Sequence, residues 1–173
     1  MNIQKYLNRI KYYSEVELTK EVMFSLQKQN LLNIPFENLD IPYGKKIKLD
    51  LDNIFQKIII NKRGGFCYKI NLLFNELLKE IGFNTFLISG RVYNENGTYR
   101  QEFDHMAIIA IIAILESKLY LVDVGFGELI LDSIDGPNSI SETIYSLFAL
   151  FIWFLFLFGG LKKYSDASKI QLR

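Results

Sequence analysis

Cysteine and histidine are almost absent from this sequence of 173 residues, which has one of each, Cys67 and His105. One cysteine cannot form an internal disulfide, so nothing in the composition requires an oxidising compartment. The same scarcity excludes a zinc site built from several cysteine and histidine ligands, and we expect no metal. The N-terminal residues lack the apolar run of a secretory signal, so we expect a cytoplasmic protein.

The chain also has no excess of charge of either sign. Twenty Lys and Arg residues stand against nineteen Asp and Glu residues, which leaves a formal net charge of +1. No basic stripe with interleaved aromatic side chains is present, so we expect no binding to nucleic acid. Half of the residues are hydrophobic, which excludes wholesale disorder and is enough for one domain with a buried core.

Apolar residues recur at helical spacing in the first part of the chain. In residues 1–34 these positions are Tyr6, Ile10, Tyr13, Leu18, Val22 and Leu26. They predict one or two amphipathic helices with buried stripes. Residues 33–44 contain two prolines and a glycine and predict a loop or extended link, and residues 51–60 predict another short helix.

Residues 62–82 carry the clearest local signal. Gly64 and Gly65 indicate a break in regular secondary structure. After Cys67 the apolar residues follow in steps of three and four as far as Ile81. This spacing predicts a helix with one buried stripe, which ends at Gly82. Cys67 then lies in the first turn of that helix, where unpaired N–H groups and the positive end of the helix dipole favour a thiolate.

Beyond residue 82 the pattern changes to that of strands. Residues 85–93, 105–115 and 118–124 are rich in β-branched and aromatic side chains and predict three strands. A tandem Ala-Ile-Ile repeat inside 105–115 has a period of three, which leaves open which side chains face the core. Helices followed by antiparallel strands predict an α+β fold, with a helical part at 1–84 and a strand part at 85–140.

Residues 141–173 form an atypical apolar tail. Within it, residues 144–158 contain Ser146 as the only clearly polar side chain. A membrane span needs about 20 apolar residues, so this run is short for one. A buried element, a membrane-associated segment and a non-native end all stay open as interpretations, and the oligomeric state stays open with them.

Cysteine catalysis needs a thiolate, a base and a group that orients the base, and the cysteine, the histidine and Asp123 supply these three. Each also has a simpler interpretation, as a small buried side chain, a packed imidazole and the end of a strand. A tight hairpin at Glu116–Ser117 would pair Asp123 with Ala110, about 16 Å of strand away from His105. A bulge, or a longer loop that takes up part of the repeat, is needed to join them.

Four motifs, in this order, resemble those of the arylamine N-acetyltransferase family. They are Ile34-Pro35-Phe36-Glu37-Asn38-Leu39, Arg63-Gly64-Gly65-Phe66-Cys67 with Asn71, His105-Met106, and Val122-Asp123-Val124-Gly125-Phe126-Gly127. The resemblance covers about residues 1–130. It implies a cysteine-protease-like fold and a catalytic triad of Cys67, His105 and Asp123. In that family the cysteine takes an acetyl group from acetyl-CoA and passes it to a small-molecule arylamine or hydrazine.

The resemblance also implies roles for residues around the triad. Phe36, Phe126 and Gly127 are expected to bind substrate, with plain core packing as an equal alternative for the two phenylalanines. Glu37 and Arg63 are expected to pair and to orient the cysteine loop as structural support. Backbone N–H groups around the cysteine are the expected oxyanion hole.

Two features depart from the family pattern. Lys69 stands where the family usually has a glutamate, and its ammonium would either stabilise a negative sulfur or break a structural ion pair. Only residues 128–173 follow the last motif, so the family's C-terminal lid and part of its β-barrel are expected to be missing. A cysteine hydrolase or transglutaminase-like enzyme, and an inactive truncated remnant of the family, therefore stand as alternatives to the acetyltransferase.

Overall fold

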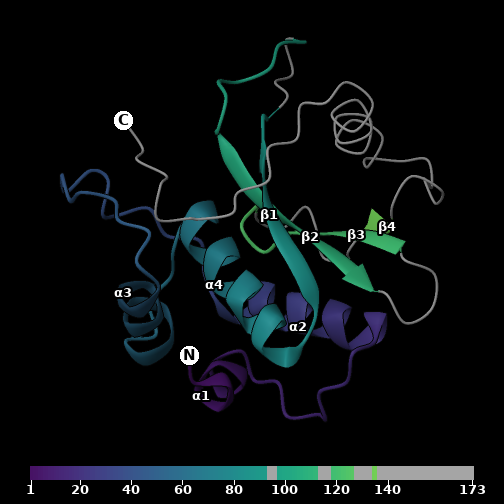
Figure 1. The fold of residues 1–173 in the computed structure, drawn as a ribbon. Coiled ribbons are helices and arrows are strands. Elements are labelled where there is room, and N and C mark those ends of the chain that lie inside the picture. The colour runs from purple at the N-terminus through teal and green to yellow at the C-terminus, as the bar shows by residue number, and fades with distance from the viewer. Residues whose placement is uncertain (93–96, 113–117, 127–133, 136–173) are drawn as a thin grey trace.

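The computed structural model describes residues 1–92, 97–112, 118–126 and 134–135 (Figure 1). The helices come first along the chain: α1 (Ile3–Arg9), α2 (Lys20–Asn33), α3 (Leu51–Phe55) with a π-helical turn η1 (Gln56–Ile60), and α4 (Cys67–Ile81). The strands follow as β1 (Asn84–Gly90), β2 (His105–Ile112), β3 (Lys118–Val122) and β4 (Ile134–Asp135). They form one antiparallel sheet in the order β1-β2-β3-β4, which confirms the predicted α+β class.

Short polar side chains begin the first three helices. Asn2, Thr19 and Asp50 each accept a hydrogen bond from a backbone N–H in the first turn of the helix that follows. Helix α4 differs, because Phe66 precedes it and supplies no side-chain cap. It ends as predicted at Gly82, whose φ of 114° is the left-handed value that glycine adopts without strain.

The predicted apolar stripe of residues 1–34 is correct at its start and wrong at Tyr13. Tyr6 and Ile10 are fully buried, whereas Tyr13 is 78% exposed and its neighbour Tyr12 is buried instead. The reason is that α1 ends at Arg9 and that Lys11 takes a left-handed conformation with φ 58°. The chain therefore leaves the helical register before residue 13.

The stripe of α2 was also predicted only in part. Leu26 is buried as expected, but Leu18 precedes the helix and is 37% exposed. Two polar side chains, Gln27 and Asn30, take buried positions on the helix in addition. Asn30 Nδ2 donates a 2.7 Å hydrogen bond to the hydroxyl of Tyr6, so one contact between α1 and α2 is polar.

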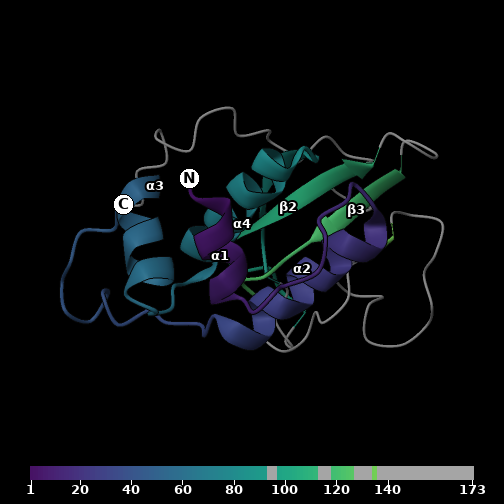
Figure 2. The ribbon, with the colours of Figure 1, turned by 90° about the horizontal axis from the view of Figure 1, so that it is seen from below.

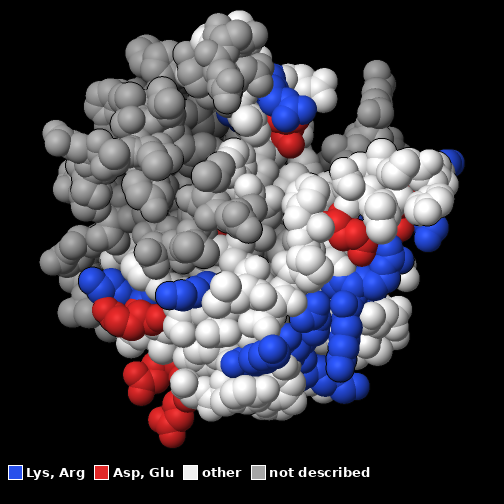
Figure 3. All heavy atoms as spheres, turned by 180° about the vertical axis from the view of Figure 1, so that it is seen from behind, with Lys and Arg blue, Asp and Glu red and all other residues white. Residues whose placement is uncertain are grey.

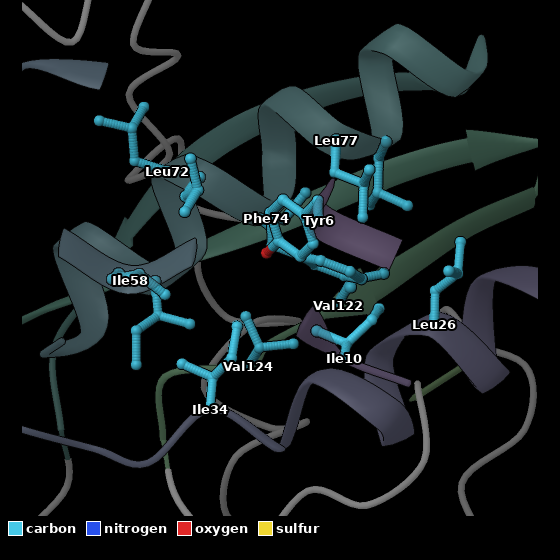
Figure 4. Packing of buried hydrophobic residues seen from close by; sticks show 14 of the residues in the cluster. Tyr6, Ile10, Leu26, Ile34, Ile58, Leu72, Phe74, Leu77, Val122 and Val124 are labelled. Atoms are coloured by element: carbon cyan, nitrogen blue, oxygen red, sulfur yellow. The ribbon is translucent and has the colours of Figure 1, made fainter. Parts of the chain in front are cut away.

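Helix α4 joins the helical and strand parts into one core. It contacts β1 and β2 on one side and α3 on the other, and it also contacts α1, whereas α2 lies alongside β3 (Figures 1 and 2). Figure 4 shows residues from both parts in this core, among them Tyr6, Phe74, Leu77 and Val122. The division of the chain at residues 84 and 140 stays a prediction.

Strand β2 is buried on both faces, which explains why its repeat did not indicate a facing. Met106, Ile108 and Ala110 belong to the main core, whereas Ala107 and Ile109 belong to a smaller cluster with residues of β1 and β3. Alternate side chains of a strand point to opposite faces. A run that is apolar at every position therefore fits a strand covered on both sides.

The register of β2 and β3 differs from the tight-hairpin register. Ile108 pairs with Val122 and Ala110 with Tyr120, so continued pairing places Asp123 opposite Ala107. Strand β2 ends at Ile112, and β3 does not begin until Lys118. Residues 113–117, which lie outside the described part of the chain, therefore separate the two strands, so the connection is longer than that of a tight hairpin. The predicted turn at 116–117 and the tail at 141–173 lie outside the described residues.

Although the net charge is close to zero, the charged side chains are unevenly distributed over the surface. On the face seen from behind, a band of Lys and Arg side chains lies at the lower right beside uncharged surface, and smaller Lys and Arg groups lie at the left and at the top (Figure 3). The acidic side chains on this face lie mainly in separate groups. Net charge alone therefore does not describe the local field around this protein.

Candidate active site

The loop before Cys67 is held by a short stretch of backbone pairing. Phe36 and Gly65 form a parallel bridge, and Glu37 N–H donates to the Gly65 carbonyl at 2.8 Å. A β-carbon on Gly64 would lie 2.1 Å from the carbonyl oxygen of Pro35, so only glycine fits there. This pairing fixes the backbone that leads into α4 and delivers Cys67 as the first residue of the helix.

The structure brings Cys67, His105 and Asp123 together. His105 opens β2, Asp123 directly follows β3, and the two side chains are joined by a 2.5 Å contact between Nε2 and Oδ2. Both residues are buried, with 4% and 0% of their surface exposed. The thiol of Cys67 is a second hydrogen-bond partner of His105. Since Nε2 faces the carboxylate, Nδ1 is the nitrogen that remains for the thiol.

The surroundings of His105 favour its charged form. Burial alone would lower its pKa, but the charge and hydrogen bond of Asp123, together with the hydrogen bond and charge of Cys67, raise the pKa from 6.5 to about 10. His105 therefore carries a positive charge at neutral pH. An imidazolium beside the cysteine is the partner that a thiolate nucleophile requires.

Asn71 connects the three segments that carry the triad. One turn after Cys67 on α4, its Nδ2 donates to the Met106 carbonyl at 2.6 Å and to Asp123 Oδ1 at 2.9 Å. Its Oδ1 accepts the backbone N–H of Val124 at 2.9 Å. Asn71 was noted in the sequence as part of a motif but was given no role. Its spacing of four residues from the cysteine, which places both on one helix face, was the signal available.

Gly125 is a second residue of the site that the sequence named only as part of a motif, without a role. Its N–H donates to Asp123 Oδ1 at 2.7 Å. A β-carbon at this position would lie 2.6 Å from the Cα of Cys67 and 2.8 Å from Asn71 Nδ2. Neither neighbour can move far, because one is helix backbone and the other is held by three hydrogen bonds. Only glycine allows the strand end to approach the nucleophile this closely.

The residues predicted to bind substrate lie in different surroundings. The ring of Phe126 meets the imidazole of His105 edge to face, with centroids 5.0 Å apart. Phe36 is 56% exposed, although it sits on the backbone segment that pairs with the cysteine loop. Exposure of this degree does not fit plain core packing at Phe36, whereas Phe126 is half-buried. Gly127 lies outside the described residues.

The predicted pair of Glu37 and Arg63 is present. Arg63 Nε donates to Glu37 Oε2 at 3.1 Å, and a second guanidinium nitrogen contacts Oε1. Lys57 Nζ lies 3.1 Å from the same carboxylate, and Gly64 N–H donates to it at 3.2 Å. Burial would raise the pKa of Glu37, but the bonds from Arg63, Lys57 and Gly64 lower it below its ordinary value. The carboxylate thus links the loop before Cys67 to η1.

Lys69 forms an ion pair. Its Nζ lies 3.0 Å from Asp40 Oδ2, and only 10% of its side chain is exposed. Asp40 also contacts Lys57 at 2.5 Å and Lys45 at 3.5 Å. The bonds from Lys57 and Lys69 hold the pKa of Asp40 well below its usual range. The lysine at this position therefore forms a structural ion pair of its own, which ties α4 to the loop that follows Phe36.

Neither a metal-binding cluster nor a membrane-spanning helix is present in the described part of the chain. Among those residues, no group of three or more His, Cys, Asp and Glu side chains could hold a metal ion. None of the described helices combines the length and the apolar character that a bilayer crossing demands. The apolar run at 144–158 lies outside these residues.

Comparison with known proteins gives consistent matches. Residues 19–137 match the sequence model of the N-acetyltransferase family. A pineal-gland arylamine N-acetyltransferase isozyme of Gallus gallus is 37% identical over 131 residues, which cover 73% of this chain and 43% of that protein. The arylamine N-acetyltransferase of Nocardia farcinica superposes with a TM-score of 0.76 at 29% identity, over 83% of this chain and 50% of that one.

A third match bears on the triad. The arylamine N-acetyltransferase of Bacillus cereus, which has a unique Cys-His-Glu catalytic triad, superposes with a TM-score of 0.70 at 28% identity, over 78% of this chain and 53% of that one. The chain thus spans about half the length of the relatives that it matches. These matches confirm the predicted cysteine-protease-like architecture, and by its sequence and its fold the chain belongs to the arylamine N-acetyltransferase family.

Proposed function

We propose that this protein is an acyltransferase that moves an acetyl group from acetyl-CoA to an arylamine or hydrazine through an acetyl-cysteine at Cys67. The observation that carries the proposal is the buried 2.5 Å contact between His105 and Asp123, with Cys67 as the other partner of the imidazole. Membership of the family supports the same chemistry.

In the first half-reaction the thiolate of Cys67 attacks the carbonyl carbon of the acetyl thioester. A new carbon–sulfur bond forms, the bond to the sulfur of coenzyme A breaks, and His105 donates its proton to that leaving sulfur. Two thioesters of similar energy are exchanged, so the step needs no further reactant. Backbone N–H groups at the start of α4 are our candidates for stabilising the oxyanion, because Phe66 supplies no side-chain cap there.

In the second half-reaction the amine nitrogen attacks the acetyl group on Cys67. His105, now neutral, takes the proton that the nitrogen loses, and the thiolate leaves as the amide forms. The imidazolium and the thiolate are thereby restored. Asp123 holds the imidazole in one orientation and stabilises its charged form. The Bacillus cereus relative, with its glutamate at the third position of the triad, is consistent with a carboxylate in this role.

Phe126 and Phe36 are the residues that we propose to contact the acceptor. The ring of Phe126 covers one edge of the imidazole, and Phe36 is exposed on the segment that pairs with Gly65. Aromatic rings at these positions suit a flat arylamine next to the reacting sulfur. On sequence grounds alone, we propose Gly127 as a further substrate-binding residue.

The experiment that tests the function is the intact mass of the purified chain after incubation with acetyl-CoA. A single acetyl adduct is expected, which disappears when an arylamine is added and is absent from a Cys67→Ala variant. Turnover of a peptide or amide without an acetyl adduct would indicate the cysteine hydrolase instead. A cooperatively folded sample that gives neither result would contradict the proposal and identify a remnant without the family's chemistry.

A further inference from the structure

Tyr68 lies next to the nucleophile but has no role in the proposed chemistry. It is the second residue of α4, directly after Cys67, and only 4% of its surface is exposed. Its hydroxyl donates a hydrogen bond to the backbone carbonyl of Phe103, which is 35 residues away in the sequence. A buried tyrosine usually finds a partner for its hydroxyl, but this partner lies in the segment that leads to the catalytic base.

Phe103 adopts an uncommon backbone conformation. Its φ is 62°, in the left-handed region that side chains other than glycine rarely occupy, and it lies in a turn two residues before His105. Such a conformation persists only where the surroundings hold it. The hydrogen bond from Tyr68 to the carbonyl of this residue is a contact of the required kind, since it fixes the orientation of the peptide group after Phe103.

Helix α4 thus holds the segment around His105 on both sides. Tyr68 binds the carbonyl of Phe103 before the histidine, and Asn71 binds the carbonyl of Met106 after it at 2.6 Å. Cys67 begins the same helix. The first two turns of α4 therefore carry the nucleophile and also fix the backbone on either side of the base.

We propose that Tyr68 is a positioning residue, whose hydroxyl holds the left-handed turn at Phe103 and so sets the place of His105 relative to Cys67. The proposal rests on the proposed function only in that it assigns His105 as the base of Cys67. It does not depend on which acyl donor or acceptor the protein uses.

The test replaces Tyr68 by phenylalanine, which removes the hydroxyl and keeps the ring. Tyr12→Phe is the matched control, because Tyr12 is also buried and its hydroxyl also donates to a backbone carbonyl, that of Glu15 at 3.1 Å. The readout is the rate at which iodoacetamide alkylates Cys67, followed by intact mass as a function of pH. We expect Tyr68→Phe to lower the rate at pH 7 about tenfold or more and to shift the profile toward that of an ordinary thiol. The control should keep the wild-type profile, with a similar change in melting temperature.

A second variant separates positioning from general stability. Asparagine tolerates the left-handed region better than phenylalanine does, so Phe103→Asn in the Tyr68→Phe background should restore part of the alkylation rate at pH 7. A lower melting temperature with an unchanged pH profile in Tyr68→Phe would overturn the proposal, and so would a double variant without recovery. If the wild type itself shows the profile of an ordinary thiol, the proposed function fails and the assignment of Tyr68 falls with it. A wild type with a perturbed profile but no acetyl adduct would contradict the acetyl transfer alone.

Discussion

Replacing Asp123 by asparagine tests whether this carboxylate keeps the imidazole of His105 charged and correctly protonated. Asp123 Oδ1 accepts hydrogen bonds from Asn71 Nδ2 and from the N–H of Gly125, and an amide oxygen can accept both in its place. The amide nitrogen then points at His105 Nε2, which can accept only if the neutral ring carries its proton on Nδ1. That nitrogen faces the thiol, so His105 can no longer take the proton of Cys67.

The size of the effect follows from the pKa of His105. The rise from 6.5 to about 10 corresponds to at most about 5 kcal/mol in favour of the imidazolium. Burial has the largest effect on this pKa, which it lowers, and it remains in the variant. His105 should therefore be neutral at pH 7. We expect the reactivity of Cys67 at pH 7 to fall about 10³- to 10⁴-fold, as the wrong tautomer does in a Ser-His-Asp triad.

The assay is the alkylation rate of Cys67 between about pH 5 and pH 10, in the wild type and in Asp123→Asn. Asp104→Asn is the matched control, since Asp104 directly precedes His105 but pairs with Arg100 at 3.2 Å. The control should react like the wild type. A folded Asp123→Asn protein that is alkylated at pH 7 as fast as the wild type would refute the reasoning, because the charge on His105 would then not depend on Asp123.

Three further changes test the surroundings of the triad. Folding raises the pKa of His105, so the charged imidazole contributes its full stabilisation below pH 6.5 and loses it as the pH rises through about 10. Urea unfolding at several pH values should show this loss of stability in the wild type but not in His105→Gln. Gly125→Ala should lower the free energy of unfolding by about 1–3 kcal/mol and abolish alkylation at pH 7, since its β-carbon would lie 2.6 Å from helix backbone. In the control Gly44→Ala the β-carbon meets nothing within 4 Å, so only backbone strain should lower the stability and alkylation should stay intact. Lys69→Glu should destabilise the protein by about 2–4 kcal/mol by facing Asp40 with a like charge, and this cost should fall in an Asp40→Asn background, as measured by thermal unfolding; an equal cost in both backgrounds would mean that the 3.0 Å pair contributes little.

Helix α4 and the triad residues could be predicted from the sequence because their signals are local or scarce. The apolar residues after Cys67 have a single helical period, and glycines bound the helix at each end. The grouping of Cys67, His105 and Asp123 was predicted for a different reason, because the chain offers one cysteine and one histidine and because the motifs around them resemble those of one family. Gly125 was missed because its requirement for glycine comes from the backbone of α4, which lies far away in the sequence.

The parts that could not be predicted depend on backbone conformations without a sequence signal. Nothing in the sequence at Lys11 indicates a positive φ. This conformation takes the chain out of the helical register and leaves Tyr13 exposed. The register of β2 and β3 depends on how many residues the connection uses, and a repeat that is apolar at every position pairs equally well in several registers. The partner of Lys69 was hidden because Asp40 lies in a loop whose path only the folded structure defines.

The geometry of the site is set by α4 rather than by the hairpin. Pairing of β2 with β3 alone leaves Asp123 opposite Ala107, two residues away from His105. Asn71 adds what the hairpin lacks, since it binds the backbone directly after His105 and the carboxylate of Asp123 with the same amide group. A helix has a fixed rise and rotation per residue, so the spacing between positions 67 and 71 fixes the nucleophile and this amide relative to each other. The sequence requirements that the structure shows for the site therefore lie in the first turns of α4 and in the glycine that packs on them.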